Sequence, residues 1–113
     1  MRSALLTFDD VTHLAGALPG AEVSTSYGTP ALKVRGKLFA RLWEDGTTLV
    51  LRAPDLVRDH LLQTDPVTFF VTDHYRGYPY VLVRLPEITA DRMEPLLEEA
   101  WRDVAPKSMR AKR

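Results

Sequence analysis

The sequence of 113 residues contains no cysteine, no long apolar run and no excess of either charge. Without cysteine the chain has no disulfide, no thiolate nucleophile and no cysteine-ligated zinc. No apolar stretch approaches the roughly 20 residues that a membrane-spanning helix needs, and no signal peptide precedes Asp9 and Asp10. We therefore expect a cytoplasmic protein without a membrane partner.

The charges of the chain balance, with 15 basic and 15 acidic residues. A dedicated DNA-binding domain usually carries a basic excess, so the total charge counts against tight binding of nucleic acid. Hydrophobic residues make up 45% and charged residues 27% of the chain, which is typical of a folded globular protein. The length suits one domain with one core.

The sequence also lacks the short signatures of several enzyme classes. It has no G-x-S-x-G elbow, no phosphate-binding P-loop and no G-x-G-x-x-G dinucleotide fingerprint. Its three histidines, His13, His60 and His74, do not have the spacing of a metal-binding pair on one helix. We therefore predict no metal site and no cofactor; catalysis is left open and is not expected.

Apolar residues repeat with helical spacing in three segments and alternate with polar residues between them. Helices are expected over residues 5–18, 53–64 and 91–104, the first with Thr7 as its N-cap. Pro95 is expected in the first turn of the last helix, because proline breaks the hydrogen-bond ladder further in. Residues 27–30 are expected to form a loop, and strands are expected over 22–25, 31–42 (a hairpin with Arg35-Gly36 at its tip), 47–51, 68–72 and 80–85.

Short connections between these strands favour antiparallel pairing. We therefore predict a single α+β domain over residues 1–106, with an antiparallel sheet and about three helices packed on one side. On the second helix, one face carries Leu56, Val57, His60 and Leu61, and we expect this face, including the histidine, to be partly buried.

A basic hairpin is the first candidate for a binding site. Lys33, Arg35 and Lys37 surround its tip, and Arg41 follows in the second strand. A β-ribbon with a charged tip can follow phosphates or enter a groove of nucleic acid. The same charges can instead protect an edge hairpin from aggregation.

The C-terminal segment is the second basic feature. Residues 107–113 are expected to be a mobile tail that carries Lys107, Arg110, Lys112 and Arg113. These cations either add sequence-independent phosphate contacts or only keep the chain end in solution. The sequence does not decide between the two.

An aromatic loop between the last two strands is the third candidate. It carries His74, Tyr75, Arg76 and Tyr78, with Asp73 beside the histidine. A neighbouring Asp and His are typical of acid–base machinery, so one hypothesis is a small-molecule-binding protein or enzyme centred on His74. Exposed aromatic side chains would instead suit a protein partner. The alternative without a function is a turn whose aromatic side chains cap the core.

The order of several short segments resembles the MmcQ/YjbR family over nearly the whole chain. Residues 32–40, Leu-Lys-Val-Arg-Gly-Lys-Leu-Phe-Ala, are similar to the family's K-V-x-G-K-x-F-A segment. Leu-Pro-Gly at 18–20 and Tyr-Gly-Thr-Pro at 27–30 precede it, and Leu-Arg-Ala-Pro at 51–54 resembles the family's junction between strand and helix. The part from Phe69 to Lys107 resembles an actinobacterial-type branch.

The resemblance implies a bacterial-type protein with a compact α/β fold, whose sheet is likened to a double-wing DNA-binding arrangement. Members are commonly labelled DNA-binding on that structural analogy, and the family has no agreed catalytic residues to carry over. One common branch has Lys-x-His-Trp where this chain reads Thr72-Asp73-His74-Tyr75, so a basic residue is lost there. We therefore expect weak, phosphate-directed DNA binding, with a protein-interaction module or a small-molecule-binding protein as alternatives, and the candidate DNA contacts are Lys33, Arg35, Lys37, Arg41, Lys107 and Arg110.

Overall fold

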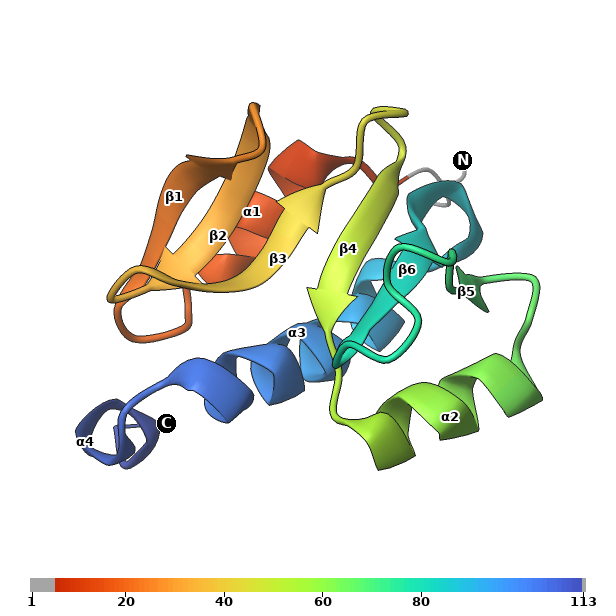
Figure 1. Cartoon of the computed structure of the whole chain (residues 1–113). Helices are drawn as coiled ribbons and strands as arrows, with labels where there is room; N and C mark the ends of the chain where they lie inside the picture. Colours follow the sequence, from red (N-terminus) through yellow and green to blue (C-terminus); the bar gives the residue numbers. More distant parts are fainter. Residues whose placement is uncertain (1–5, 113) are drawn as a thin grey trace.

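A six-stranded sheet organises the chain in the computed structural model, which describes residues 6–112. The strand order across the sheet is β1-β2-β3-β4-β6-β5, and every neighbouring pair is antiparallel (Figure 1). This confirms the expected α+β fold. The strands are β1 (Ala21–Ser26), β2 (Thr29–Val34), β3 (Lys37–Leu42), β4 (Thr48–Arg52), β5 (Phe69–Phe70) and β6 (Tyr80–Arg84).

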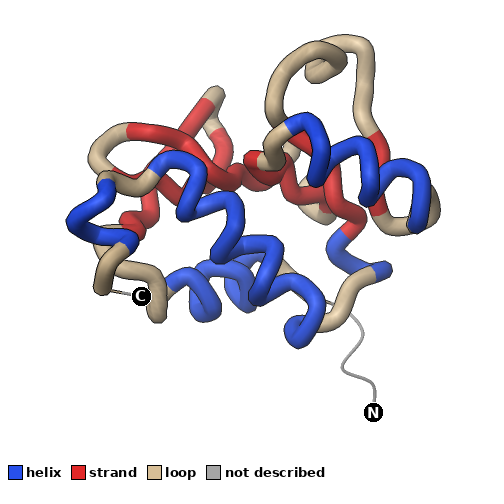
Figure 2. The backbone as a smooth tube through the Cα atoms, turned by 90° about the horizontal axis from the view of Figure 1, so that it is seen from below, coloured by secondary structure: helices blue, strands red, loops and turns tan. Residues whose placement is uncertain are grey.

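The helices α1 and α3 lie against one side of this sheet, and the loop after β5 rises on the other side (Figure 2). The short helix α4 follows α3 at the C-terminal end, and α2 packs beside β5 and β6. The helices are α1 (Phe8–Ala15), α2 (Asp55–Thr64), α3 (Ala90–Val104) and α4 (Lys107–Arg110), and residues Leu85–Glu87 form a 3-10 turn, η1.

Alternation along the central strands sorts side chains onto two faces of the sheet. In β4, Leu49 and Leu51 join the main core beneath the helices, whereas Val50 between them joins a second, smaller cluster. Leu82 of β6 and Tyr75 of the loop complete that smaller cluster. We call the side packed against α1 and α3 the covered face and the opposite side the open face.

A β-bulge in β3 changes which side chains reach the open face. Leu32 of β2 lies opposite Ala40, and the next residue, Lys33, lies opposite Leu38, so Phe39 is the extra residue. Phe39 and Ala40 both enter the main core. Leu38 therefore lies on the open face although a regular alternation from Ala40 would place it on the covered face.

The first helix follows the expectation from the sequence closely. The Thr7 hydroxyl accepts a hydrogen bond from the Asp10 N–H at 3.3 Å, and the Asp10 carboxylate accepts one from the Thr7 N–H at 2.9 Å. This reciprocal capping box confirms Thr7 as the N-cap. The helix ends at Ala15 rather than at Leu18, and the residues after it continue as turns.

Two expected boundaries were wrong. Residues 27–30 are not a loop: Tyr27 and Gly28 form a two-residue turn, and Thr29 already pairs with Ser26. The strand expected over residues 68–72 is only the pair Phe69–Phe70, because the chain turns away at Val71 into the loop over the open face.

The prediction for the second helix was wrong about its face. Leu56 is 86% exposed and His60 is exposed, whereas Leu61 is buried. The main contacts of the helix with the sheet are to the narrow edge formed by β5 and β6, so it buries fewer positions than its apolar pattern suggests. His60 is therefore a surface residue and not a partly buried one.

The last helix and the C-terminal segment also differ from the expectation. The helix α3 begins at Ala90, so Pro95 lies inside it rather than in its first turn, and the Asp91 carbonyl loses its usual N–H partner. Residues 107–110 form α4 instead of a mobile tail, and Met109 packs against the main core. Arg113 lies outside the described residues.

Candidate functional site

The loop of residues 71–79 builds the candidate site by folding over the open face of the sheet (Figure 1). Arg58 of α2 donates to the Tyr78 carbonyl at 2.6 Å, and the Ala53 N–H donates to the Pro79 carbonyl at 2.8 Å. Tyr75 at the centre of the loop packs on Val50 and Leu82 in the smaller cluster. The loop is therefore held at a fixed place above the strands.

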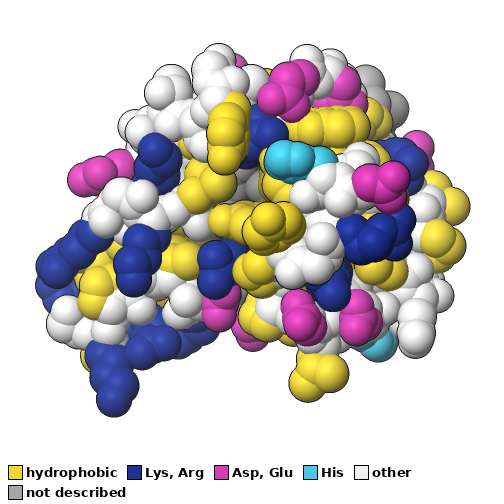
Figure 3. Space-filling model, viewed as in Figure 1, with side chains coloured by type: hydrophobic (Ala, Val, Ile, Leu, Met, Phe, Trp, Pro, Cys, Tyr) yellow, Lys and Arg dark blue, Asp and Glu magenta, His cyan; other side chains and the backbone are white. Residues whose placement is uncertain are grey.

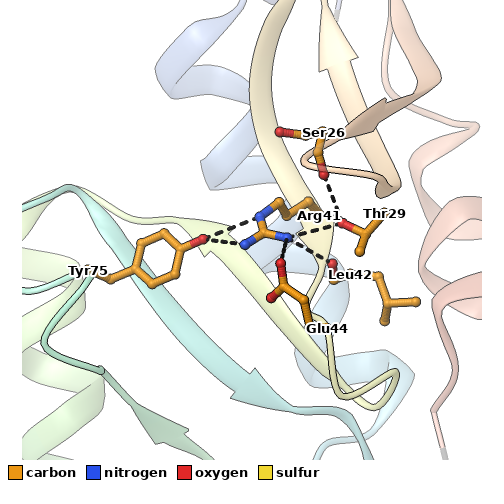
Figure 4. Close-up of polar contacts among 6 residues, drawn as sticks. All are labelled: Ser26, Thr29, Arg41, Leu42, Glu44 and Tyr75. Carbon is orange, nitrogen blue, oxygen red and sulfur yellow. Dashed lines mark hydrogen bonds and ion pairs between the residues drawn. The ribbon is translucent and has the colours of Figure 1, made fainter.

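Arg41 is the polar centre of this face (Figure 4). Its Nε and Nη2 donate to the Tyr75 hydroxyl at 3.2 and 2.7 Å, and its Nη1 donates to the Thr29 hydroxyl at 3.1 Å. Nη1 also lies 3.3 Å from a Glu44 carboxylate oxygen and 3.3 Å from the Leu42 carbonyl oxygen. Arg41 thus ties β3, the β1–β2 turn and the loop together.

This network removes Arg41 from the exposed cations of the hairpin. Arg41 is only 3% exposed, since the loop and Tyr75 cover it, so it does not share the solvent-facing surface expected from the sequence. Burial alone would lower the pKa of Arg41, but the hydrogen bonds and charges of Tyr75 and Glu44 outweigh it and raise that pKa. A backbone hydrogen bond at Glu44, together with Arg41, lowers the pKa of the Glu44 carboxyl. The guanidinium is therefore stabilised in its charged form.

Two hollows on the open face share Arg41 as lining, and a third, which reaches the C-terminal end of α3, shares Leu38 and Tyr80 with the second. The first has a volume of about 300 Å³ and the second about 230 Å³; they share Tyr27, Arg41, His74 and Tyr75 as lining. The third, of about 360 Å³, reaches Lys37. We call the three together the open-face groove, and its remaining lining residues are Leu38, Trp43, Glu44, Arg52, Thr72, Tyr78, Tyr80, Asp103 and Val104.

Aromatic rings gather along one part of the rim of this groove. Tyr27 is 80% exposed and Tyr78 is 59% exposed, whereas Tyr75 is 8% exposed. The Arg41 guanidinium carbon lies 5.1 Å from the centre of the Tyr27 ring, which places a cation against this ring. The His74 ring meets Tyr75 edge-on at 4.8 Å. Figure 3 shows hydrophobic side chains gathered along the middle of this side of the molecule.

The neighbouring Asp73 and His74 do not form the acid–base pair that the sequence suggested. The Asp73 carboxylate lies 3.1 Å from Arg76 Nη2, and both side chains are exposed. His74 instead contributes its ring to the groove. Of the four predicted loop residues, the structure brings His74, Tyr75 and Tyr78 to the groove and leaves Arg76 outside its lining.

The tip of the β2–β3 hairpin carries the cations predicted from the sequence. Arg35 and Lys37 are exposed, and Lys33 is half-buried on the open face opposite Leu38. Lys33 also lies opposite Glu22 of β1, a residue of opposite charge. Arg35 and Lys37 are therefore the more available cations of the hairpin.

The helix α4 brings a second group of cations to the same end of the molecule. A Cβ atom placed on Gly20 would lie 2.5 Å from the Met109 sulfur and 3.6 Å from Val34 Cγ1, so α4 packs close to the tip end of the hairpin. In Figure 3, Lys and Arg side chains gather where Figure 1 shows the hairpin tip and α4. We call this surface the basic end; its residues are Lys33, Arg35, Lys37, Lys107, Arg110 and Lys112.

Among residues 6–112, no three His, Asp or Glu side chains come together as ligands for a metal ion. Within the same residues, every helix is too short or too polar to cross a bilayer.

Sequence reasoning missed Tyr27, Trp43 and Glu44 as members of the site. Tyr27-Gly28 has the form of the Arg35-Gly36 turn, with a large residue before glycine between two alternating segments, and this signal could have predicted a second exposed turn. Trp43 and Glu44 carry no local signal, because only the fold of the distant loop brings them beside His74.

Comparison with known proteins gives the relationships of this fold. The model of the YjbR family matches residues 16–103. Uncharacterized proteins of Mycobacterium tuberculosis (Rv2570) and Mycobacterium bovis (Mb2600) are each 32% identical over 125 residues, with 93% of both chains covered. The crystal structure of Deinococcus radiodurans protein DR2400, with the family-model domain DUF419, has a TM-score of 0.78 at 20% identity and covers 99% of this chain and 91% of that one.

The match to the family model spans most of the chain, and the structural neighbour has the same fold. The order of short segments in the sequence pointed to the same family. The chain therefore belongs to the YjbR family.

Proposed function

We propose that this protein binds nucleic acid weakly and mainly through phosphates, using the basic end. The observation that carries this proposal is the convergence of six cations, from the hairpin tip and from α4, at one end of the molecule. Among the ion pairs of residues 6–112, none involves these six side chains. Unpaired Lys and Arg side chains are the groups that release counterions from a phosphate backbone.

The zero net charge of the chain does not oppose this proposal. Six other arginines form ion pairs with acidic residues, so much of the acidic charge is neutralised locally; they are Arg41, Arg52, Arg58, Arg76, Arg92 and Arg102. The charge that remains is unevenly distributed, and local distribution rather than the sum determines phosphate binding.

Fluorescence anisotropy of a short labelled DNA, titrated with protein at several salt concentrations, tests the proposal. We expect the logarithm of the association constant to fall with the logarithm of the salt concentration, by about 0.9 per contacted phosphate of a duplex. The double variant Arg35→Asn, Lys37→Gln should reduce this slope by roughly one unit for each phosphate that the removed cations neutralise in the wild type. Asn suits the hairpin turn, because the φ angle of Arg35 is +51°.

A matched control removes two exposed arginines that lie away from the basic end. The double variant Arg76→Gln, Arg84→Gln loses the same formal charge, and we expect its affinity and salt slope to equal those of the wild type. If the wild type does not bind any DNA at low salt and micromolar protein, or if both double variants weaken binding equally, the proposal is wrong.

A further inference from the structure

We infer that the preferred nucleic acid is single-stranded, with its bases stacked in the open-face groove and its phosphates following the basic end. The inference rests on the proposed function and adds the substrate class. It is carried by the two strained turns of the hairpins, by the continuity of the groove with the cations, and by the aromatic rim.

The two strained turns lie at opposite ends of β2. Among residues 6–112, the non-glycine residues with positive φ are Tyr27, at +54°, and Arg35, at +51°. Each precedes a glycine in a two-residue turn, where Asn or Gly would avoid the strain. Each instead projects a large exposed side chain, a ring at one end and a cation at the other. Because strained backbone conformations are concentrated at functional sites, the two positions indicate a binding role for both side chains.

The groove runs from Tyr27 toward the hairpin tip and reaches Lys37, two residues after Arg35. Tyr27 lines its first two hollows, Leu38 lines the second and third, and Lys37 lines the third. Lys33 is the cross-strand neighbour of Leu38, so a second cation lies beside the same stretch. Tyr27 and Arg35 are eight residues apart, a distance of about 25 Å at the rise of a strand. This is comparable with the sites of about four or more nucleotides that single OB-fold domains bind.

The rim favours unpaired bases over a duplex. Tyr27 and Tyr78 expose most of their rings beside His74, and any base can stack on such a ring because every base has a π-face. In a duplex the bases already stack on one another, so these rings would remain unused. The buried Arg41 lies against the Tyr27 ring and fixes its position from one side without being available to a phosphate.

The test compares three labelled oligonucleotides of equal length by anisotropy: a pyrimidine single strand, the corresponding duplex, and a single strand with abasic sugars. We expect the pyrimidine strand to bind most tightly. Tyr27→Asn should weaken that binding about 5- to 150-fold, the size of one missing stack, while leaving the salt slope unchanged because the tyrosine ring neutralises no phosphate. Tyr27→Phe, which keeps the ring, should bind like the wild type.

Asn at position 27 accepts the positive φ, so the variant should melt at or above the temperature of the wild type. A second pair of variants, Tyr78→Ala and Tyr78→Phe, makes the same comparison of affinity for the pyrimidine strand at the ring carried by the loop. If the abasic strand and the duplex bind as tightly as the pyrimidine strand, and Tyr27→Asn changes nothing, the stacking inference is wrong while phosphate binding at the basic end survives. If no oligonucleotide binds, the proposed function fails as well.

Discussion

On the covered face the strands meet helices through a large apolar cluster, whereas on the open face they meet a loop around an arginine and a tyrosine hydroxyl. The same strands serve both: in β4, Leu49 and Leu51 point one way and Val50 the other. The covered face therefore carries most of the hydrophobic stabilisation, and the open face is free to hold polar and aromatic groups in fixed positions.

The largest effect is expected on the covered face. Trp101 of α3 is fully buried, and its indole Nε1 donates to the Pro19 carbonyl at 2.8 Å. Trp101→Ala should lower the free energy of unfolding by about 3–5 kcal/mol, measured by urea denaturation. Leu56→Ala, at an apolar position that is 86% exposed, is the control and should change it by no more than about 0.5 kcal/mol. A decrease below about 1 kcal/mol at Trp101 would contradict the assignment of stability to this face.

A smaller effect is expected on the open face. Tyr75→Phe removes the hydroxyl that accepts from Arg41 Nε and Nη2 and leaves part of a buried guanidinium without a partner. We expect a decrease of about 1–3 kcal/mol in the free energy of unfolding. Tyr78→Phe removes a hydroxyl from an exposed ring and should be neutral. Equal stability of the two variants would mean that water replaces the Tyr75 hydroxyl and that the network is not needed for folding.

The contrast between the faces also separates what the sequence predicts from what it does not. The covered face follows from periodicity, because the helices and strands repeat apolar residues at their own spacing, and the capping box at Thr7 is a local signal. The open face depends on contacts between residues far apart in sequence. Arg41 and Tyr75 are separated by 34 positions, so nothing local shows that the cation is buried.

Errors in the predicted elements have the same origin. The prediction for the face of α2 fails because amphipathic spacing does not show how wide a surface the helix will pack against. The surface is too narrow to cover Leu56, whose side chain stays exposed. Cations dominate the composition of residues 107–113, which is why the sequence predicts a tail. The apolar side chain of Met109 nevertheless packs α4 against the main core. The bulge at Phe39 moves Leu38 to the open face. A prediction that assigns strand residues alternately to the two faces cannot anticipate this shift.

The proline inside α3 offers a way to change one face without the other. Pro95→Ala restores an N–H that can donate to the Asp91 carbonyl and places the best helix former at an exposed position. Part of the gain is offset by the greater freedom of the unfolded chain, so we expect stabilisation of about 1 kcal/mol in urea denaturation. The anisotropy titration should not change. A destabilised variant would show that α3 bends at this proline to fit the sheet.

The smallest effect is expected for an ion pair that links the end of α2 to α3. The Arg92 guanidinium lies 2.5 Å from the Asp65 carboxylate, and its hydrogen bond, followed by that of Thr68, lowers the pKa of Asp65 below its ordinary 3.8. A lowered folded-state pKa gives stability that is present above the unfolded pKa and is lost as the pH falls through the folded one. Since Arg92 is 43% exposed, we expect Asp65→Asn to cost less than about 1 kcal/mol at neutral pH.

The pH dependence decides whether the charge or only the shape of Asp65 matters. Asn keeps an oxygen that can accept from the Thr68 N–H, so any difference from the wild type at neutral pH reports mainly the pair with Arg92. Urea denaturation of both proteins should show this difference shrinking as the pH falls below 3.8 and vanishing once Asp65 is protonated in the folded state. A difference that persists in acid would assign the destabilisation to packing at the end of α2. On the open face Arg41 is also paired with Glu44, and the pKa of that carboxyl is lowered as well, so the network around Tyr75 should also lose stability in acid. The comparison of Asp65→Asn with the wild type at each pH therefore isolates the pair with Arg92.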